Sequence, residues 1–386
     1  MTPASKRANG CHSGERQNPE KYWVPPSNYL TGQAPQVRHE GAGIFIRRNN
    51  ITRALNAGRS GWSAWVERGG SRLESNPVHP PFDTQKRYYD LNAYFRSLFG
   101  RRVHKIAIDA GFTCPNRDGR IGTGGCIYCN SRGSGTGAHA SGKSVTEQIE
   151  ASIPYLTRRF KAKSFIAYFQ SFSNTYAPLE RLRRVYDEAL AVKNVVGLAI
   201  GTRPDCVDPP VLDLLQAYAA KRLVWVEYGL QSACDETLAR INRGHDFACF
   251  KRAVAATRDR GIRICAHVIL GLPGENRRHA IRTARAVSKL GIDGIKLHLL
   301  YVVRGTPLES LYRSGRYRCL EMTEYANWVC DVLEHLPPGV VIQRLTGDPH
   351  PEELVAPAWS LDKRRTLAAI KKILEERNSW QGKYVI

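Results

Sequence analysis

The feature that most constrains the fold of this chain is a regular alternation of short apolar runs with helix-patterned stretches. The apolar, strand-like runs lie at 103–108, 164–170, 195–201, 223–229, 262–269 and 293–300, and helical patterns fill intervals between them at 178–192, 209–220, 246–260 and 276–290. Strands that alternate with helices in this way are parallel and are joined by right-handed crossovers. The pattern therefore predicts either an α/β barrel or an open parallel sheet.

A glycine-rich loop with three cysteines follows the first apolar run. Cys114, Cys126 and Cys129 are separated by eleven residues and then by two. Three thiolates in one loop can hold three irons of a four-iron cluster and leave the fourth iron open. Zinc also accepts thiolates, with His104 or His139 as the nearest fourth ligand, and a disulfide or no metal is a third interpretation. The spacing alone leaves these alternatives open.

Polar residues end the successive strand-like runs. They are Gln170, Arg203, Glu227, His267 and either Lys296 or His298. In a parallel barrel the carboxyl ends of the strands carry the chemistry, because the loops that follow them converge at that rim. The cysteine loop follows the first strand and is expected on the same rim. A single buried histidine is more often a satisfied interior group, but five polar strand ends beside a metal loop predict a site.

Composition restricts the class of protein and its partners. The 386 residues carry a formal net charge of +22 and are 42% hydrophobic, which is enough for a sizeable core and favours a polyanionic partner, with nucleic acid as the first candidate. Ten cysteines at irregular spacing do not resemble a small disulfide scaffold. No apolar run reaches the length of a membrane span, and no secretory signal is apparent, so we expect a cytoplasmic protein without a membrane partner.

The chain divides into three parts by pattern. Residues 1–83 mix Gly, Pro, Ser, Asn and Arg without sustained periodicity, which predicts a basic, disordered extension. Residues 84–310 form the predicted barrel. Residues 311–386 contain helical patterns and one strand candidate, and we expect them to be a short α/β extension that packs on the barrel.

Longer motifs connect these features to a known family. The chain contains Asp109-Ala-Gly-Phe-Thr-Cys-Pro-Asn-Arg-Asp-Gly, Gly125-Cys-Ile-Tyr-Cys129, Gly201-Thr-Arg-Pro-Asp205, Glu227-Tyr-Gly-Leu-Gln231, Ile241-Asn-Arg-Gly-His245 and Gly271-Leu-Pro-Gly-Glu275. In this combination the chain resembles the radical S-adenosylmethionine (SAM) superfamily, and within it the YhcC-like group, which is related to the Elongator catalytic subunit. The eleven-residue spacing of the first two cysteines, instead of the three residues of most members, also resembles this group.

The resemblance implies a fold, two cofactors and roles for particular residues. The fold is a partial (β/α)6 TIM barrel, and the cofactors are SAM and one [4Fe-4S] cluster held by Cys114, Cys126 and Cys129. Tyr128 would lie near the adenine of SAM, whereas Arg203 and Glu227 are candidates for its carboxylate and ribose. Gln170 stands where many relatives have a Gly-Gly-Glu turn for the SAM amine, and His267 belongs to the same cofactor-binding rim. No catalytic residue is assigned.

The resemblance also implies a reaction. A reduced cluster cleaves SAM to methionine and a 5′-deoxyadenosyl radical, which abstracts hydrogen from the substrate. The Elongator-like motifs and the basic charge favour RNA as substrate, specifically a wobble uridine of tRNA, with flavodoxin or ferredoxin as reductant. One alternative is a radical SAM reaction on a small molecule or tetrapyrrole. Another, from a different class, is a non-catalytic, zinc-stabilised RNA-binding protein.

Overall fold

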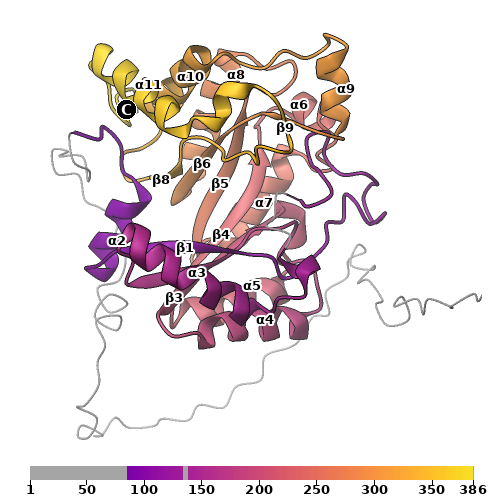
Figure 1. Cartoon of the computed structure of the whole chain (residues 1–386), viewed down its shortest axis with the longest axis vertical. Helices are drawn as coiled ribbons and strands as arrows, with labels where there is room; N and C mark the ends of the chain where they lie inside the picture. The colour runs from indigo at the N-terminus through magenta and orange to yellow at the C-terminus, as the bar shows by residue number, and fades with distance from the viewer. Residues whose placement is uncertain (1–84, 134–137, 386) are drawn as a thin grey trace, which may run out of the picture. The chain divides into compact units, whose positions relative to one another are not determined.

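The computed structural model describes residues 85–133 and 138–385 and contains one parallel seven-stranded sheet (Figure 1). The predicted extension at 1–83 lies outside the described residues. The order in the sheet is β1-β2-β3-β4-β5-β6-β8, so β1 to β6 each pair with the next strand of the chain, and β8 pairs with β6. The strands are β1 (Val103–Ile108), β2 (Ser164–Phe169), β3 (Val195–Thr202), β4 (Leu223–Gln231), β5 (Arg263–Leu270), β6 (Gly294–Leu299) and β8 (Val341–Arg344).

Helices on the outer face of the sheet alternate with its strands. They are α3 (Val145–Phe160), α4 (Leu179–Ala191), α5 (Pro209–Ala219), α6 (Asp235–Arg240), α7 (Phe247–Thr257) and α8 (Arg277–Ser288). Of these, α4, α5, α7 and α8 lie where the sequence predicts helices. The outward side chains of the strands and the inward side chains of these helices form the largest hydrophobic core. The result is the predicted α/β fold, a parallel half-barrel with helices outside.

The strand pattern separates an outer face from an inner one, because successive side chains of a strand point to opposite faces. In β4, for example, Val224, Val226 and Tyr228 belong to the outer core, whereas Trp225 belongs to a second cluster inside the half-barrel. All nine residues of β4 are buried. A strand that is buried on both faces is typical of a central parallel strand covered by helices.

Helix α2 (Leu91–Phe99) fills the end of the half-barrel where the strands begin. Its N-cap, Asp90, accepts a hydrogen bond from Ala93 N, and Gly100 ends the helix in the left-handed region at φ +64°. Phe95 is 1% exposed and packs in the inner cluster with Trp225 and Val341. Asp90 bridges to Ile342 of β8, so the segment before α2 lies against the last strand of the sheet.

The C-terminal part adds both to the sheet and to the helical layer. It contains β7 (Val302–Val303), α9 (Pro307–Arg313), α10 (Met322–Glu334), β8, β9 (Leu354–Ala356) and α11 (Lys363–Glu376). β8 continues the sheet in parallel beside β6, and β7 pairs with β9 in an antiparallel ribbon. Elsewhere in the described residues, short 3-10 helices lie at His139–Ser141 and Pro204–Cys206, and a third lies in this part at Ala358–Leu361. The extension therefore supplies a seventh strand to the six predicted for the barrel.

Candidate functional site

One cavity at the carboxyl ends of the strands gathers all the residues predicted from the sequence. Its volume is about 310 Å³. The predicted residues that line it are Cys114, Cys126, Tyr128, Cys129, Gln170, Arg203, Glu227 and His267. The structure thus brings together side chains from the cysteine loop and from the ends of β2, β3, β4 and β5.

The cysteine loop is fixed by backbone contacts on both of its sides. Ile127 N donates to Ile241 O at 3.1 Å, and Leu308 N, at the start of α9, donates to Ile127 O at 2.9 Å. The eleven-residue spacer folds back on itself, since Gly125 N donates to Asn116 O at 2.8 Å. Gly125 has φ +79°, a conformation that glycine adopts at little cost, and a Cβ there would lie 3.0 Å from Arg117 Nη1. The loop is therefore a preformed element of the site.

The Cys126 sulfur faces buried hydrogen-bond donors. Arg243 Nη1 lies 3.6 Å and Asn116 Nδ2 lies 3.8 Å from Cys126 Sγ. The other guanidinium nitrogens of Arg243 donate to Gly229 O at 3.1 and 2.5 Å. Burial disfavours the Arg243 cation, but the Cys126 sulfur and Tyr128 beside it raise the pKa of Arg243 above its ordinary value. A buried guanidinium aimed at a sulfur stabilises a thiolate.

Burial dominates the ionisation of Cys129 and Tyr128 in the same loop. Burial and the neighbouring Cys126 raise the pKa of the Cys129 thiol to about 11, although Arg117 opposes the shift. Burial and Cys126 also raise the pKa of Tyr128 well above its ordinary value. Both groups are therefore protonated at neutral pH unless a cation replaces the proton on sulfur, as a metal does.

Arg203 is held in place at the end of β3. Its Nε and Nη2 donate to the two carboxylate oxygens of Asp205 at 2.8 and 2.7 Å. Its Nη1 donates to Arg243 O at 2.8 Å. The pKa of Asp205 stays below its ordinary value because Arg203 outweighs the effect of burial. Arg203 thereby orients the turn that carries Arg243, and it also lines the cavity.

Glu227 is the centre of a buried charge cluster beneath the cysteines. Its Oε1 lies 2.5 Å from Lys105 Nζ, and its Oε2 accepts from Lys296 and lies 2.8 Å from His267 Nε2. Glu227 is 0% exposed, and these partners bind both of its oxygens. Tyr168 covers the pair of lysines, with Lys296 Nζ 3.9 Å from the ring centroid. The cluster forms a polar layer between the cavity and the apolar inner cluster around Phe95.

The protonation states in this layer follow from its charges. Burial opposes ionisation of Glu227, but Lys105 and Lys296 hold its pKa well below the ordinary value. Burial lowers the pKa of Lys296 to about 7, although Glu227 opposes this shift, and burial lowers the pKa of His267 to about 4. His267 is therefore neutral at pH 7 and donates its Nε2 proton to Glu227.

Two buried polar atoms of the cavity wall, Ser173 Oγ and His298 Nε2, have no hydrogen-bond partner among the described residues. The rings of His298 and His267 lie 5.2 Å apart, and both line the cavity. Buried polar atoms are paired in most structures, so these two atoms point to a polar ligand in the cavity.

The sequence analysis missed several residues of this site. Lys105 and Gln343 lie on the inner faces of the two edge strands, and Lys105 Nζ is 2.5 Å from Gln343 Oε1. Only the assembled sheet places these two side chains beside Glu227. Arg243 lies within the quoted Ile241–His245 motif, but its spacing gave no reason to single it out. Alternation along β1 could have indicated Lys105, because it shares a face with the buried Val103.

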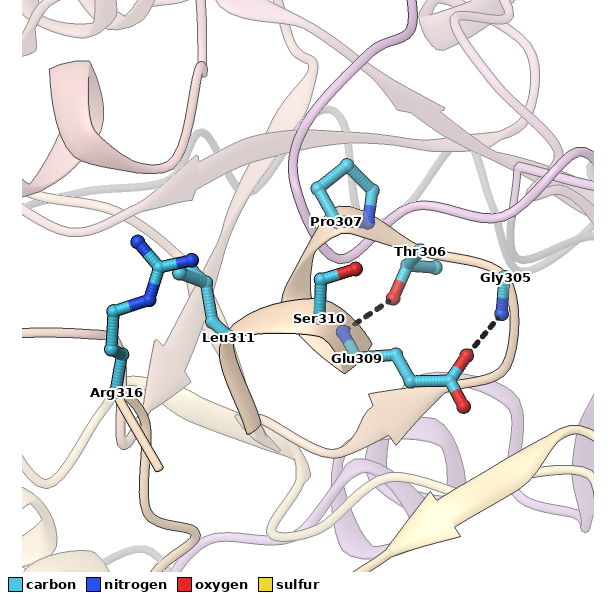
Figure 2. Close-up of a pocket in the computed structure, with 7 residues that line it drawn as sticks. All are labelled: Gly305, Thr306, Pro307, Glu309, Ser310, Leu311 and Arg316. Atoms are coloured by element: carbon cyan, nitrogen blue, oxygen red, sulfur yellow. Dashed lines mark hydrogen bonds between the residues drawn. The ribbon is translucent and has the colours of Figure 1, made fainter. Parts of the chain in front are cut away.

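A second pocket, at the start of α9, has a different character (Figure 2). It is lined by Gly305, Thr306, Pro307, Glu309, Ser310, Leu311 and Arg316. Its polar groups satisfy one another: Thr306 caps the helix at Glu309 N, and Glu309 accepts from Gly305 N at 2.6 Å. These groups of the second pocket thus form hydrogen bonds with one another, whereas the cysteine cavity has buried polar atoms without a partner among the described residues.

Comparisons with known proteins now identify the family. Residues 117–306 match the model of the Radical SAM superfamily, and residues 292–376 match that of the Radical_SAM C-terminal domain. The chain is 43% identical over 312 residues to the uncharacterised protein YtqA of Bacillus subtilis. The aligned residues cover 81% of this chain and 97% of YtqA. The chain belongs to the radical SAM superfamily. It is also 40% identical over 279 residues to YhcC of Escherichia coli, covering 72% of this chain and 89% of YhcC, in agreement with the predicted group.

More distant similarities concern proteins linked by name to Elongator and tRNA. The structure of Elp3 from the archaeon Methanocaldococcus infernus matches with a TM-score of 0.57 at 17% identity, over 72% of this chain and 64% of that one, which is under two thirds of its length. At this identity the match shows a shared fold. A tRNA uridine(34) acetyltransferase of Dehalococcoides mccartyi is 30% identical over 156 residues, covering 40% of this chain and 33% of that protein.

As a radical SAM enzyme, this protein uses a [4Fe-4S] cluster and SAM. Among the described residues, no three Cys, His, Asp or Glu side chains converge on a point that could hold a single metal ion. The three thiols line one cavity together, and thiolates are the protein ligands of four-iron clusters. The Arg243 guanidinium and the unpaired atoms of Ser173 and His298 fit an anionic cluster and a polar cofactor. The radical SAM fold thus matches the donor set of the cavity.

Two further properties of the described residues concern membrane-spanning helices and disulfides. No helix in the described part of the chain is long and apolar enough to cross a membrane. The nine described cysteines are all free thiols.

Proposed function

We propose that this radical SAM enzyme modifies RNA, with a wobble uridine of tRNA as the target, and that Cys114, Cys126 and Cys129 ligate its cluster. The observation that supports the ligand assignment is that these three thiols line one cavity together with a buried guanidinium. A cluster held by these three cysteines would supply the one-electron reduction of SAM that generates the radical for hydrogen abstraction from the substrate. The residues of the chain bind and orient the reactants and exclude water.

The residues around the cavity take distinct parts in this proposal. Arg243 stabilises the Cys126 thiolate, and Arg203 positions the turn that carries Arg243. Tyr128 and Gln170 remain the proposed SAM contacts at the wall. The sequence predicts that Glu227 contacts the SAM ribose. We propose instead that Glu227 positions Lys105, Lys296 and His267, because these three residues occupy both of its oxygens. His298 takes over as the polar contact of that wall, with its open Nε2.

Support for an RNA substrate comes from charge and from relatives. The net charge of +22 favours a polyanion. The names of the Elp3 structure and of the tRNA uridine(34) acetyltransferase point to tRNA. We also propose a cytoplasmic location and a flavodoxin or ferredoxin as electron donor.

A tetrapyrrole or other small-molecule reaction is the competing proposal, and one experiment separates the two. The protein is reconstituted anaerobically with iron and sulfide, reduced with dithionite in the presence of SAM, and assayed for 5′-deoxyadenosine with and without an unmodified tRNA transcript. We expect a brown protein that forms 5′-deoxyadenosine and binds the transcript with an affinity that falls steeply as salt is added. Salt-insensitive or absent binding contradicts the RNA proposal but leaves the cofactor chemistry intact.

The ligand assignment has its own variant and control. Cys126→Ala is expected to lose the cluster absorbance and more than 99% of 5′-deoxyadenosine formation, a hundredfold or larger effect of roughly 2.7 kcal/mol or more. Cys330→Ala, a buried cysteine of α10 outside the cavity lining, is expected to keep both. A colourless protein that holds zinc and leaves SAM intact would instead favour the zinc-stabilised RNA-binding protein.

A further inference from the structure

A strongly basic surface lies at the opposite end of β1 and β2 from the cysteine loop. Its seven exposed cations come from α2, α3 and the segments that lead from these helices into the two strands: Arg96, Arg101, Arg102, Arg158, Arg159, Lys161 and Lys163. The ion pairs found between described residues include none of them. We call these residues the α2–α3 basic surface; Figure 1 shows α2, β1 and α3 side by side.

The backbone beneath this surface is rigid and concave. Lys163 N donates to Arg102 O at 3.0 Å, and Arg102 Nη1 donates to Phe160 O at 3.0 Å. The strands that follow are paired from their first residues, Val103 with Ser164. A depression of about 470 Å³ there is lined by Arg96, Gly100, Arg101, Arg102, Lys161 and Lys163, which means that every side chain longer than glycine in its wall is a cation.

Aromatic rings adjoin the cations. Tyr155 is 53% exposed, and its ring packs edge-on against Phe160 with centroids 6.2 Å apart. His104 stacks on the same Phe160 ring at 4.6 Å, and the Arg159 guanidinium lies 5.4 Å from its centroid. Exposed rings among basic side chains are the surface that nucleic acids use, because phosphates pair with the cations and unpaired bases stack on the rings.

Helix electrostatics explains only part of this surface. Cations are favourable in the last turn of a helix, and Arg96, Arg158 and Arg159 occupy last turns. Arg101, Arg102, Lys161 and Lys163 lie at or beyond the helix ends and line one depression that has no carboxylate in its wall. Like charges gathered in one depression are unfavourable in the free protein and become favourable against a polyanion.

We propose that the α2–α3 basic surface binds the phosphate backbone of the RNA substrate, and that Tyr155 stacks on an unpaired base next to it. This inference rests on the proposed RNA substrate and adds a second contact region to it. β1 spans six residues, or about 20 Å at roughly 3.3 Å per residue, between this surface and the cysteine loop. A folded RNA that places one base in the cavity is large enough to reach along the side of the half-barrel to the basic surface.

Charge-reversal variants of the full chain test the phosphate contacts. Arg101→Glu/Lys163→Glu changes two cations of the depression, and Arg364→Glu/Arg365→Glu makes the same change in charge on two exposed residues in the first turn of α11. The probe is a fluorescently labelled, unmodified tRNA transcript titrated at several salt concentrations. We expect the first variant to bind at least about tenfold more weakly at 0.1 M salt, with a log–log salt slope shallower by about two, and the second to resemble the wild type.

Tyr155→Ala tests the stacking contact, with Tyr312→Ala, another exposed tyrosine, as its control. Loss of one base stack is expected to weaken binding of the transcript roughly fivefold to a hundredfold without changing the salt slope. Formation of 5′-deoxyadenosine from SAM in the absence of RNA is expected to be unchanged in all four variants, because none of these residues lines the cavity.

The outcomes distinguish this inference from the proposed function. If the wild type binds no transcript, the RNA substrate fails and this inference fails with it. If the wild type binds with a steep salt slope but the α2–α3 and α11 variants weaken it equally, RNA remains the substrate and the α2–α3 basic surface is overturned as its contact region. Weakening confined to Arg101→Glu/Lys163→Glu and to Tyr155→Ala supports the surface.

Discussion

Glu227 shows how single residues set the charge balance inside the half-barrel. A lone buried carboxylate is costly, but Lys105 and Lys296 pair with it and His267 donates to it. The carboxylate in turn keeps two buried ammonium groups paired. His267 completes the arrangement as a neutral donor, since a charged imidazole there would add a further cation beside Lys296 and Arg344. Stability of this layer therefore depends on His267 remaining unprotonated.

The first prediction concerns the pH dependence that this requirement causes. Burial lowers the pKa of His267 to about 4 in the folded protein, against about 6.5 in an unfolded chain. Between these values the unfolded state binds a proton that the folded state does not, so stability falls as pH is lowered from 6.5 to 4, by about 3 kcal/mol from this residue. His267→Gln keeps an amide donor for Glu227 and does not titrate, so its denaturation midpoint should change less over that interval.

The control for this prediction is His350→Gln, at an exposed histidine, which should leave the wild-type pH profile unchanged. Chemical denaturation of the three proteins at pH 4.0, 5.0, 6.0 and 7.0 provides the measurement. Equal slopes for the wild type and His267→Gln would mean that other buried groups, such as His298, carry the whole effect.

At the scale of elements, what the sequence could predict depended on whether local pattern or tertiary contact decides the structure. The six strands of the barrel and helices α4, α5, α7 and α8 follow apolar periodicity and were predicted. α3 was not, because Pro154 interrupts its pattern and the cysteine loop runs up to it. The two-residue β7 and three-residue β9 exist only because they pair with each other. Site residues at strand ends were predictable, whereas Lys105 and Arg243 acquire their roles from partners more than one hundred residues away.

Helix α2 has local sequence signals, but its role is not visible in the sequence. Its N-cap Asp90 and its C-cap Gly100 mark its ends, whereas its position inside the open end of the half-barrel depends on the assembled sheet. Phe95 fills that end, and Phe95→Ala is expected to destabilise the protein by about 3–5 kcal/mol. The cluster around Glu227 separates Phe95 from the cavity, so 5′-deoxyadenosine formation per folded molecule should be unchanged.

Thermal or denaturant unfolding of Phe95→Ala checks this prediction, with Asn92→Ala on the exposed side of the same helix as control. A loss of SAM cleavage by the folded Phe95→Ala protein, at unchanged stability, would show that α2 acts on the cavity instead of closing the base of the half-barrel.

At the scale of the whole molecule, the first and last described segments join across the open side of the sheet. β1 and β8 are the edges of the sheet and do not pair. Ile342 N of β8 donates to Tyr89 O, and Tyr89 N donates to Gln381 Oε1 at 2.9 Å. Gln381 is 0% exposed, and its Nε2 donates to Pro337 O and Val340 O at 2.7 and 2.8 Å. One side chain therefore links the C-terminal extension to the segment that leads into α2 and to the loop before β8.

These contacts predict that the barrel and the extension unfold together. Gln381→Ala leaves Tyr89 N–H and Val340 O without this partner, whereas Pro337 O still accepts from Val340 N at 3.0 Å. Each buried group left unsatisfied costs about 1–3 kcal/mol. If the junction couples the two parts, amide hydrogen exchange should accelerate by a similar factor in β1–β3 and in α10–α11. Gln216→Ala, the same substitution at an exposed residue of α5, should change exchange little. Acceleration confined to α10–α11 would instead identify the extension as a domain that unfolds by itself. The exchange rates in β1–β3 and in α10–α11 therefore decide whether this half-barrel stays folded without its seventh strand.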